Sequence, residues 1–356
     1  MRGRLFYERF QNAKLYLLRF GIAFRDIIWY SFPMENKYSN KYLIETGIGL
    51  QDVDGLKNSP YFLSQAEKYI KGEISLEQLD KLVNDYYENK QGQDEETIEA
   101  DMVSKRIAQI ISDDSFVFTV GQFVSIHEYL FKDVFGHAGK FRDYNFIKRE
   151  WVLDGRSVIC GDYRVLQSTL EYDFEIERNF EYSNLTIDET IKHLATFVSN
   201  LWQIHPFREG NTRTTAVFFI KYLRSLGFDI TNDVFAKNAW YFRNALVRAN
   251  FKFIRKGIYD DKTYLILFLR NLLLGENNKL KNRYIRIDID KQSDIPLSRE
   301  LRIIELIKND PHISVDELAK RIGVSPRTID NVLASLTKEN KIKRINGKRY
   351  GYWEVI

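Results

Sequence analysis

The stretch LTIDETIKHLATFVSNLWQIHPFREGNTRTTAVFFIKYLRSLGF (residues 185–228) decides the fold. Thr186 followed three residues later by Glu189 forms a capping box, which predicts that a helix begins there. Apolar residues then recur at helical spacing, at Ile191, Leu194, Val198, Leu201 and Trp202. The end of the stretch is apolar again. We therefore expect two helices that are joined by a short polar turn.

The polar turn, HPFREGNTRTT, begins at His205 and places several reactive side chains close together. The start of a helix exposes unpaired backbone N–H groups and the positive end of its dipole, so it binds phosphate readily. Gly210 allows close approach of the backbone, and Asn211 and Arg213 can donate hydrogen bonds to phosphate oxygens. Glu209 can hold Mg²⁺, and His205 can accept a proton. These residue types predict group transfer from a nucleotide to a hydroxyl.

The composition is typical of a folded protein in a reducing compartment. Of the 356 residues, 44% are hydrophobic and 14% are aromatic, which is enough for two or three domains with buried cores. The single cysteine, Cys160, excludes an internal disulfide and a cysteine-based zinc cluster. No stretch has the uncharged apolar length of a membrane span. We expect a cytoplasmic location and no membrane partner.

Positive charge is concentrated at the two ends of the chain. The formal net charge is +4, but residues 1–33 carry six Arg and Lys against two acidic residues, and residues 297–356 carry twelve against eight. Any attraction to nucleic acid is therefore expected at the ends. Residues 1–33 are interpreted either as a surface-binding amphipathic helix or as a poorly ordered extension ahead of a second start at Met34.

Breaks in the hydrophobic periodicity divide the remaining chain into parts. Ser59 and Ser75 predict helix starts near the N-terminus, and Asp154-Gly155 predicts the turn of a β-hairpin. The fold class is therefore all-α in the main, with a short hairpin. The predicted parts are a helical unit (34–90), a mainly helical domain (97–282), a linker (283–296) and a winged helix-turn-helix domain (297–356).

HPFREGNTR resembles the signature of the Fic family, His-x-Phe-x-(Asp/Glu)-Gly-Asn-x-Arg. The resemblance extends over about residues 97–282 and includes SIHEYLFKDVFGHAGKFRDYNF, which precedes the expected hairpin. It implies an all-helical core in which the hairpin acts as a flap. It also implies ATP as the donor, Mg²⁺ as the cofactor, and transfer of AMP to a Ser, Thr or Tyr hydroxyl of a target protein or of the chain itself.

The family pattern implies a role for each matching residue. His205 is the base, Glu209 is the metal ligand, and the phosphate cradle is formed by Gly210, Asn211, Thr212 and Arg213. The flap residues implied to hold the target backbone by strand addition are Lys148, Val152 and Ile159. Two positions depart from the pattern. Thr212 replaces a glycine, and Ala216 replaces a second arginine that handles the terminal phosphate in many relatives, which leaves the donor and the rate open.

Residues 42–88 resemble the small antitoxin partners of Fic toxins. In that family the Glu of a (Ser/Thr)-x-x-x-Glu-(Gly/Asn) helix contacts the second arginine and blocks productive ATP binding. The corresponding stretch here is LQDVDGL, with Leu50 for the Ser, Asp54 for the Glu, and Gly55 matching. Because Ala216 replaces the usual partner, the ion pair of the relatives cannot form. Inhibition of the reaction by this helical unit (the brake) is therefore weak, steric or lost. Two other segments match the inhibitory pattern residue for residue, Ser31–Asn36 and Ser335–Asn340. We interpret both as the exposed surface of helices.

The C-terminal part has the element spacing of a winged helix. Its candidate recognition helix begins at Ser325, where side chains can reach base edges in DNA. The candidate DNA contacts are Arg327, Thr328 and Asn331 in the helix and Lys348 in the wing. A protein-interaction or dimerisation module is the alternative, because Asp330 and Glu339 dilute the positive charge and fold alone does not fix function. The chain can therefore also form a homo-oligomer.

The sequence favours a Mg²⁺-dependent protein adenylyltransferase with a fused regulatory unit. A rival enzymatic interpretation is the transfer of a different phosphate-containing group, or the removal of AMP. A rival of another class is a DNA-binding regulator whose Fic core senses nucleotides without catalysis. The formation of labelled product from labelled ATP distinguishes the enzymatic interpretations from the regulatory one. For a regulator we expect salt-sensitive DNA binding and no labelled product.

Overall fold

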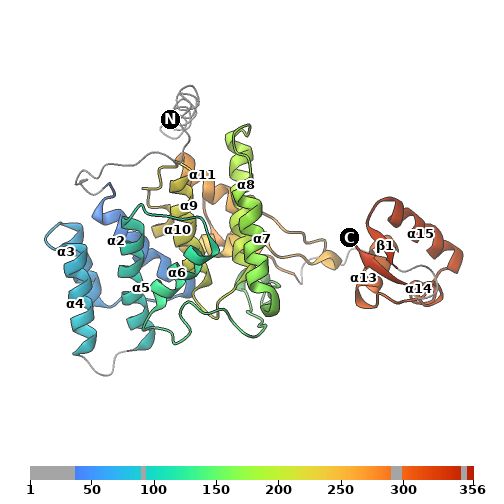
Figure 1. Ribbon diagram of the computed structural model, residues 1–356, viewed down its shortest axis with the longest axis horizontal. Coiled ribbons are helices and arrows are strands. Elements are labelled where there is room, and N and C mark those ends of the chain that lie inside the picture. The colour runs from blue at the N-terminus through green and yellow to red at the C-terminus, as the bar shows by residue number, and fades with distance from the viewer. Residues whose placement is uncertain (1–36, 90–93, 290–298, 346–350) are drawn as a thin grey trace. The chain divides into compact units, whose positions relative to one another are not determined.

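The structure, a computed structural model, falls into two compact units that are described separately below (Figure 1). It describes residues 37–89, 94–289, 299–345 and 351–356. The first unit runs to Phe251 and includes Asp260–Asp288, and the second consists of Lys252–Tyr259 and the residues from Ile289 onward. The described residues are mainly helical, as the sequence predicts, and their one sheet has two antiparallel strands.

The first unit is a stack of helices that are linked by short turns. Its α-helices are α2 (Asn40–Gly49), α3 (Pro60–Ile70), α4 (Leu76–Glu88), α5 (Glu95–Ser112), α6 (Val120–Phe131), α7 (Leu166–Arg178), α8 (Ile187–Ile204), α9 (Asn211–Ser225), α10 (Val234–Ala249), α11 (Thr263–Leu274) and α12 (Asn282–Ile285). Its 3-10 turns are η1 (Leu50–Asp54), η2 (Trp151–Leu153) and η3 (Tyr163–Val165). Figure 1 shows α3 beside α4 and α7 beside α8, and both pairs are in contact.

The predicted helix starts are confirmed. Thr186 and Glu189 form both hydrogen bonds of a capping box at the start of α8, and Ser59 accepts the hydrogen bond from Phe62 N–H that caps α3. Ser75 caps α4 in a second capping box, with Gln78. Each cap satisfies N–H groups that the first helical turn leaves unpaired.

Helix α9 is the centre of the first unit. It packs against α5, α6, α8 and η1, and every residue from Asn211 to Leu223 is buried. A helix that is buried on all sides can include polar side chains only if they are satisfied internally. The polar residues in its first turn therefore have fixed partners, and these partners define the site.

Two glycines bring η1 against this central helix. A Cβ atom on Gly47 would lie 2.2 Å from the carbonyl oxygen of Ser104 in α5, and one on Gly49 would lie 2.1 Å from the carbonyl oxygen of Ala236 in α10. Both positions therefore need glycine, because any side chain would push α2 away from its neighbours. The close approach of α2 places η1, with Asp54 at its end, beside α9.

The expected β-hairpin at Asp154-Gly155 is shorter than predicted. Both residues have the positive φ of the predicted turn, but the flanking chain forms one isolated bridge, between Glu150 and Arg156, instead of a ladder. Residues Trp151–Leu153 form the 3-10 turn η2, in which Val152 is buried. Burial of this side chain in the first unit competes with an extended strand.

The second unit has the predicted order of three helices and two strands. Its elements are η4 (Ile254–Lys256), α13 (Arg299–Asn309), α14 (Val315–Ile322), α15 (Pro326–Lys338), β1 (Ile342–Ile345) and β2 (Tyr352–Val355). The strands are antiparallel, with Ile342 opposite Val355. The helices and β1 enclose an apolar core that includes Ile303, Leu318, Ile329 and Leu336. The residues between the two strands, 346–350, lie outside the described residues.

Among the described residues, none of the helices has both the length and the apolar character needed to cross a membrane.

Candidate active site

The turn between α8 and α9 is built on two residues with left-handed backbone conformations. His205 ends α8 with φ of 50°, and Gly210 precedes α9 with φ of 76°. At Gly210 a Cβ atom would lie 2.3 Å from the ring of Phe131. Only glycine fits there without strain. Gly210, Asn211 and Thr212, at the start of α9, line a cavity.

Asn211 closes the turn from inside. Its side-chain oxygen accepts a hydrogen bond from Phe207 N–H (3.0 Å), and its amide nitrogen donates to the Phe207 carbonyl (2.8 Å). Phe207 is fully buried. Asn211 is predicted to donate to phosphate, but in the structure its amide is engaged by the turn. The residues of this helix start also line the cavity.

The ring of His205 has a defined tautomer. Its Nδ1 lies 3.0 Å from the carbonyl oxygen of Trp202, which can only accept, so Nδ1 carries the proton and Nε2 keeps its lone pair. Burial, with a smaller contribution from nearby cations that include Lys148, lowers the pKa of His205 to about 3. His205 lines the cavity. A neutral imidazole in this position can accept a proton.

Arg142 holds the backbone of His205 in place. Its Nε donates to the His205 carbonyl at 2.7 Å, its backbone N–H donates to the Pro206 carbonyl, and its guanidinium also donates to the carbonyls of Tyr144 and Gly161. The side chain is buried. Arg142 lies in the quoted segment KFRDYNF, but one sequence offers no signal that this arginine positions the histidine.

His127 holds the other end of the turn. Its Nδ1 accepts from Gly139 N–H at 2.9 Å, so its Nε2 carries the proton and donates to the Glu209 carbonyl at 3.0 Å. The ring stacks on Phe207. Burial lowers the pKa of His127 to about 4, so the ring is neutral at physiological pH. Sequence reasoning missed this role as well, because a lone histidine in a helix carries no motif.

Glu209 faces a cavity of about 250 Å³ that is also lined by His205, Lys148 and Asp54. Its side chain is 57% exposed. Mg²⁺ in nucleotide sites is commonly held by one or two carboxylates together with substrate phosphates, and Glu209 fits that pattern. Within the described residues, no group of three or more His, Cys, Asp or Glu is placed to hold a metal without such help.

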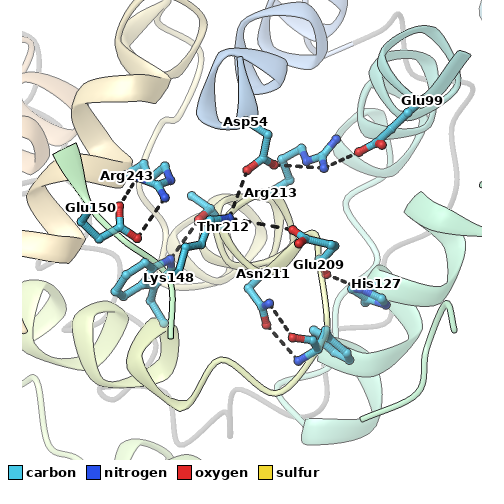
Figure 2. Close-up of polar contacts among 12 residues, drawn as sticks. Asp54, Glu99, His127, Lys148, Glu150, Glu209, Asn211, Thr212, Arg213 and Arg243 are labelled. Atoms are coloured by element: carbon cyan, nitrogen blue, oxygen red, sulfur yellow. Dashed lines mark hydrogen bonds and ion pairs between the residues drawn. The ribbon is translucent and has the colours of Figure 1, made fainter. Parts of the chain in front are cut away.

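Arg213 is buried among polar partners from other elements (Figure 2). Its Nη2 lies 3.0 Å from the carboxylate of Asp54 and 2.5 Å from that of Glu99, and its Nη1 donates to Gln51. Burial raises the pKa of Glu99. Asp54 is thus paired with the first arginine of the motif, although the second is replaced by the buried Ala216. The sequence predicted neither Gln51 nor Glu99 as a partner.

Lys148 lies between two carboxylates of the cavity. Its Nζ is 3.8 Å from Glu209 Oε2 and 3.9 Å from Asp54 Oδ1. Two residues further along the chain, Glu150 forms a buried, two-pronged ion pair with Arg243 of α10, with distances of 2.7 and 3.0 Å (Figure 2). This pair fixes the segment that carries Lys148, and no sequence pattern indicates it.

Comparison with known protein families identifies two domains in the chain. Residues 117–223 match the Fic/DOC family, and residues 299–353 match the family described as an HTH domain. Residues 117–223 are a Fic/DOC domain. No curated protein matches the chain. A solved structure titled as a Fic family protein from Desulfovibrio desulfuricans G20 covers 100% of this chain and 95% of its own, with 14% identity and a TM-score of 0.42.

The Fic/DOC domain includes the whole of the predicted motif and the flap segment. Of the flap residues, the side chain of Ile159 is 84% exposed to solvent, whereas that of Val152 is buried in the protein. Thr212, which departs from the family glycine, accepts a hydrogen bond from Trp202 Nε1 at 2.9 Å. Gly55 ends η1 with φ of 74°, which places the Asp54 side chain at the end of the turn, beside the Fic/DOC domain.

The HTH domain presents most of its candidate DNA contacts on α15. Ser325 caps this helix. Arg327 and Asn331 are exposed and Thr328 is half-buried, whereas Lys348 lies outside the described residues. Ser335 and Glu339, part of one literal match to the inhibitory pattern, hydrogen-bond to each other on the surface of this domain. The other match, Ser31–Asn36, lies outside the described residues.

Proposed function

We propose that the chain is a protein adenylyltransferase, which transfers AMP from ATP to a Ser, Thr or Tyr hydroxyl of a target protein or of itself. The observation that carries the proposal is the neutral ring of His205 beside the open start of α9, in one cavity with Glu209. A base, an anion-binding helix start and a carboxylate are the groups that this transfer requires.

Residues of the chain accept the proton of the acceptor hydroxyl and hold His205 and Glu209 in position. The acceptor hydroxyl gives its proton to His205 Nε2 while its oxygen bonds to the α-phosphorus, and the bond from that phosphorus to the β-phosphate bridging oxygen breaks, so that pyrophosphate leaves. Arg142 holds the His205 carbonyl and His127 holds the Glu209 carbonyl. The backbone N–H groups of α9 stabilise the charge on the phosphates.

Glu209 would hold Mg²⁺ together with the phosphates of ATP, and the metal would neutralise negative charge on the leaving group. Its carboxylate is exposed to the cavity while its backbone is fixed by His127. A ligand with a fixed backbone and a carboxylate that is exposed to the cavity can bind a metal that arrives with its substrate.

We also propose that residues 34–90 regulate this reaction through Asp54 and Gly55. Asp54 pairs with Arg213, and that pairing keeps the guanidinium away from the cavity. An arginine that is engaged in this way cannot contact phosphate. The proposed brake therefore acts on the first arginine of the motif, in contrast to the contact that the resemblance implies.

Incubation of the purified chain with ATP labelled at the α- or the γ-phosphate, with Mg²⁺ and a cell lysate, tests the proposal. Protein-bound label from α-labelled ATP alone is the expected result. Label from γ-labelled ATP indicates a different phosphate transfer. Loss of label from protein already carrying labelled AMP indicates removal of AMP.

A second proposed function is DNA binding by the HTH domain. The supporting observation is the exposed start of α15, where Arg327 and Asn331 reach solvent while Ile329 and Leu333 form the core. Salt-sensitive binding to duplex DNA is expected, because phosphate contacts release counterions. If the HTH domain binds DNA and the chain yields no labelled product, a nucleotide-sensing regulator is favoured over an enzyme.

A further inference from the structure

The cavity beside α9 needs a cation if it is to bind a polyphosphate, and most nearby arginines are already engaged. Arg213 is buried against Asp54, Glu99 and Gln51. Arg208 lines the cavity, but its guanidinium is paired with Asp143 at 2.9 Å and lies over the ring of Tyr144. Position 216 on α9 holds a buried alanine, which has no charge to offer.

Lys148 is the cavity cation with the loosest contacts. Its distances of 3.8 Å to Glu209 and 3.9 Å to Asp54 exceed hydrogen-bond length. The side chain is 41% exposed, so it can reorient without breaking a buried network. An ammonium group also recognises phosphate as a point charge and needs no fixed fork geometry.

The backbone that carries Lys148 is held beside the cavity. Glu150 is anchored to α10 by its buried pair with Arg243, and the neighbouring Phe146 and Ile147 line the same cavity. Lys148 is close enough to His205 to contribute to the lowered pKa of that ring. A fixed backbone and an ammonium group that is held only by two long ion pairs are suited to following a ligand in the cavity.

We propose that Lys148 is the phosphate-binding cation of this site and that it contacts the phosphates of ATP that leave as pyrophosphate. This inference rests on the proposed function and changes the role of Lys148 from holding the target to holding the donor. When ATP binds, the ammonium group moves from the two carboxylates to the phosphate oxygens. Glu209 is then released to hold the metal.

Calorimetric titration of the full chain with ATP and with AMP tests the inference. The proteins compared are Asp54→Asn, in which the brake is relieved, and the same variant with Lys148→Ala, Lys148→Arg or Lys192→Ala added. Lys192 is an exposed lysine of α8 and serves as the control. We expect Lys148→Ala to weaken ATP binding about tenfold, with AMP binding unchanged. Lys148→Arg retains most of the ATP affinity, and Lys192→Ala has no effect.

The Asp54→Asn background distinguishes phosphate binding by Lys148 from simple neutralisation of the Asp54 carboxylate. If Lys148 only neutralised Asp54, Lys148→Ala would not weaken ATP binding once Asp54 is replaced, and that result overturns the inference. An equal loss of ATP and AMP affinity also overturns it, because a general change in the cavity would then be the cause. If neither the wild type nor Asp54→Asn binds ATP, the proposed function itself fails.

Discussion

The carboxylate of Asp54 lies 3.0 Å from the guanidinium of Arg213 and joins the end of η1 to the first turn of α9. The same guanidinium binds Glu99 of α5, so two carboxylates share one buried cation. The family pattern predicts neither of these contacts, because it pairs the inhibitory Glu with the second arginine of the motif and not with the first. The structure thus has a carboxylate–arginine contact at the site, but it joins Asp54 to the first arginine of the motif, Arg213.

Replacing Asp54 by Asn is expected to raise AMP transfer several-fold. The change removes one of the two carboxylates that hold Arg213 away from the cavity. It is expected to lower the free energy of unfolding by about 1–2 kcal/mol, because a charged hydrogen bond is lost while Glu99 remains. Initial rates with α-labelled ATP measure the first effect, and urea unfolding measures the second. Asp52→Asn, on the same 3-10 turn, is the control, and equal rates for both variants contradict the brake.

Replacing His205 by Ala is expected to lower AMP transfer by a factor of about 10² to 10⁴, the range of general base catalysis. ATP affinity should stay close to that of the wild type, because in the proposed complex the phosphates contact the backbone at the start of α9 rather than the His205 ring. Rates and calorimetric affinities, measured on the same preparations, separate the two. A large loss of ATP affinity would show that the ring is needed for binding rather than for proton transfer.

Replacing Arg142 by Lys is expected to lower AMP transfer about tenfold with a smaller effect on ATP affinity. Lysine keeps the charge but loses the fork that binds the carbonyls of His205, Tyr144 and Gly161. The His205 ring is then less well oriented. A variant with a lower melting temperature but unchanged kinetics indicates a purely structural role.

The stability of the first unit is expected to fall as the pH drops below about 6.5, the ordinary pKa of histidine. Burial lowers the folded-state pKa of His127 to about 4 and that of His205 to about 3, so the unfolded chain takes up protons first. Above pH 6.5 both states are neutral and the effect vanishes. The loss approaches about 1.4 kcal/mol per pH unit for each ring.

Urea unfolding at several pH values between 7.5 and 5, for the wild type and for His127→Gln, measures the contribution of one ring. The variant should show a shallower pH dependence. Identical slopes would mean that His127 is protonated in the folded chain. It would then donate from both ring nitrogens, which is incompatible with the hydrogen bond from Gly139 N–H.

Replacing Arg327 by Ala is expected to weaken DNA binding by the HTH domain and to reduce the salt dependence of the affinity by about one counterion if the contact is to phosphate. Arg327 is exposed at the start of α15. Titration of fluorescent duplex DNA at several salt concentrations measures both effects. Lys308→Ala, on an exposed position of α13, is the control. Absence of binding by the wild type favours an interaction module instead.

The sequence predicted the elements whose signals are local. The predicted helix starts at Thr186 and Ser75 are both present, and each has a capping box. Contacts between distant segments were not predictable. Arg142 and His205 are 63 residues apart, and Arg213 and Glu99 are 114 apart. A single sequence carries no pairing signal for such contacts.

The flap shows the same limit at short range. Asp154-Gly155 has the predicted turn conformation, but burial of Val152 and the pair between Glu150 and Arg243 shorten the hairpin to one bridge. Local turn chemistry is readable from sequence, whereas the length of the ladder depends on tertiary packing.

The most direct test of the central claim is a transfer assay with α-labelled ATP and Mg²⁺ that compares Asp54→Asn with Asp54→Asn/His205→Ala. The variant with a relieved brake should place label on protein, and the double variant, which still binds ATP, should place almost none. Equal labelling of the two proteins would contradict the assignment of His205 as the base at the start of α9.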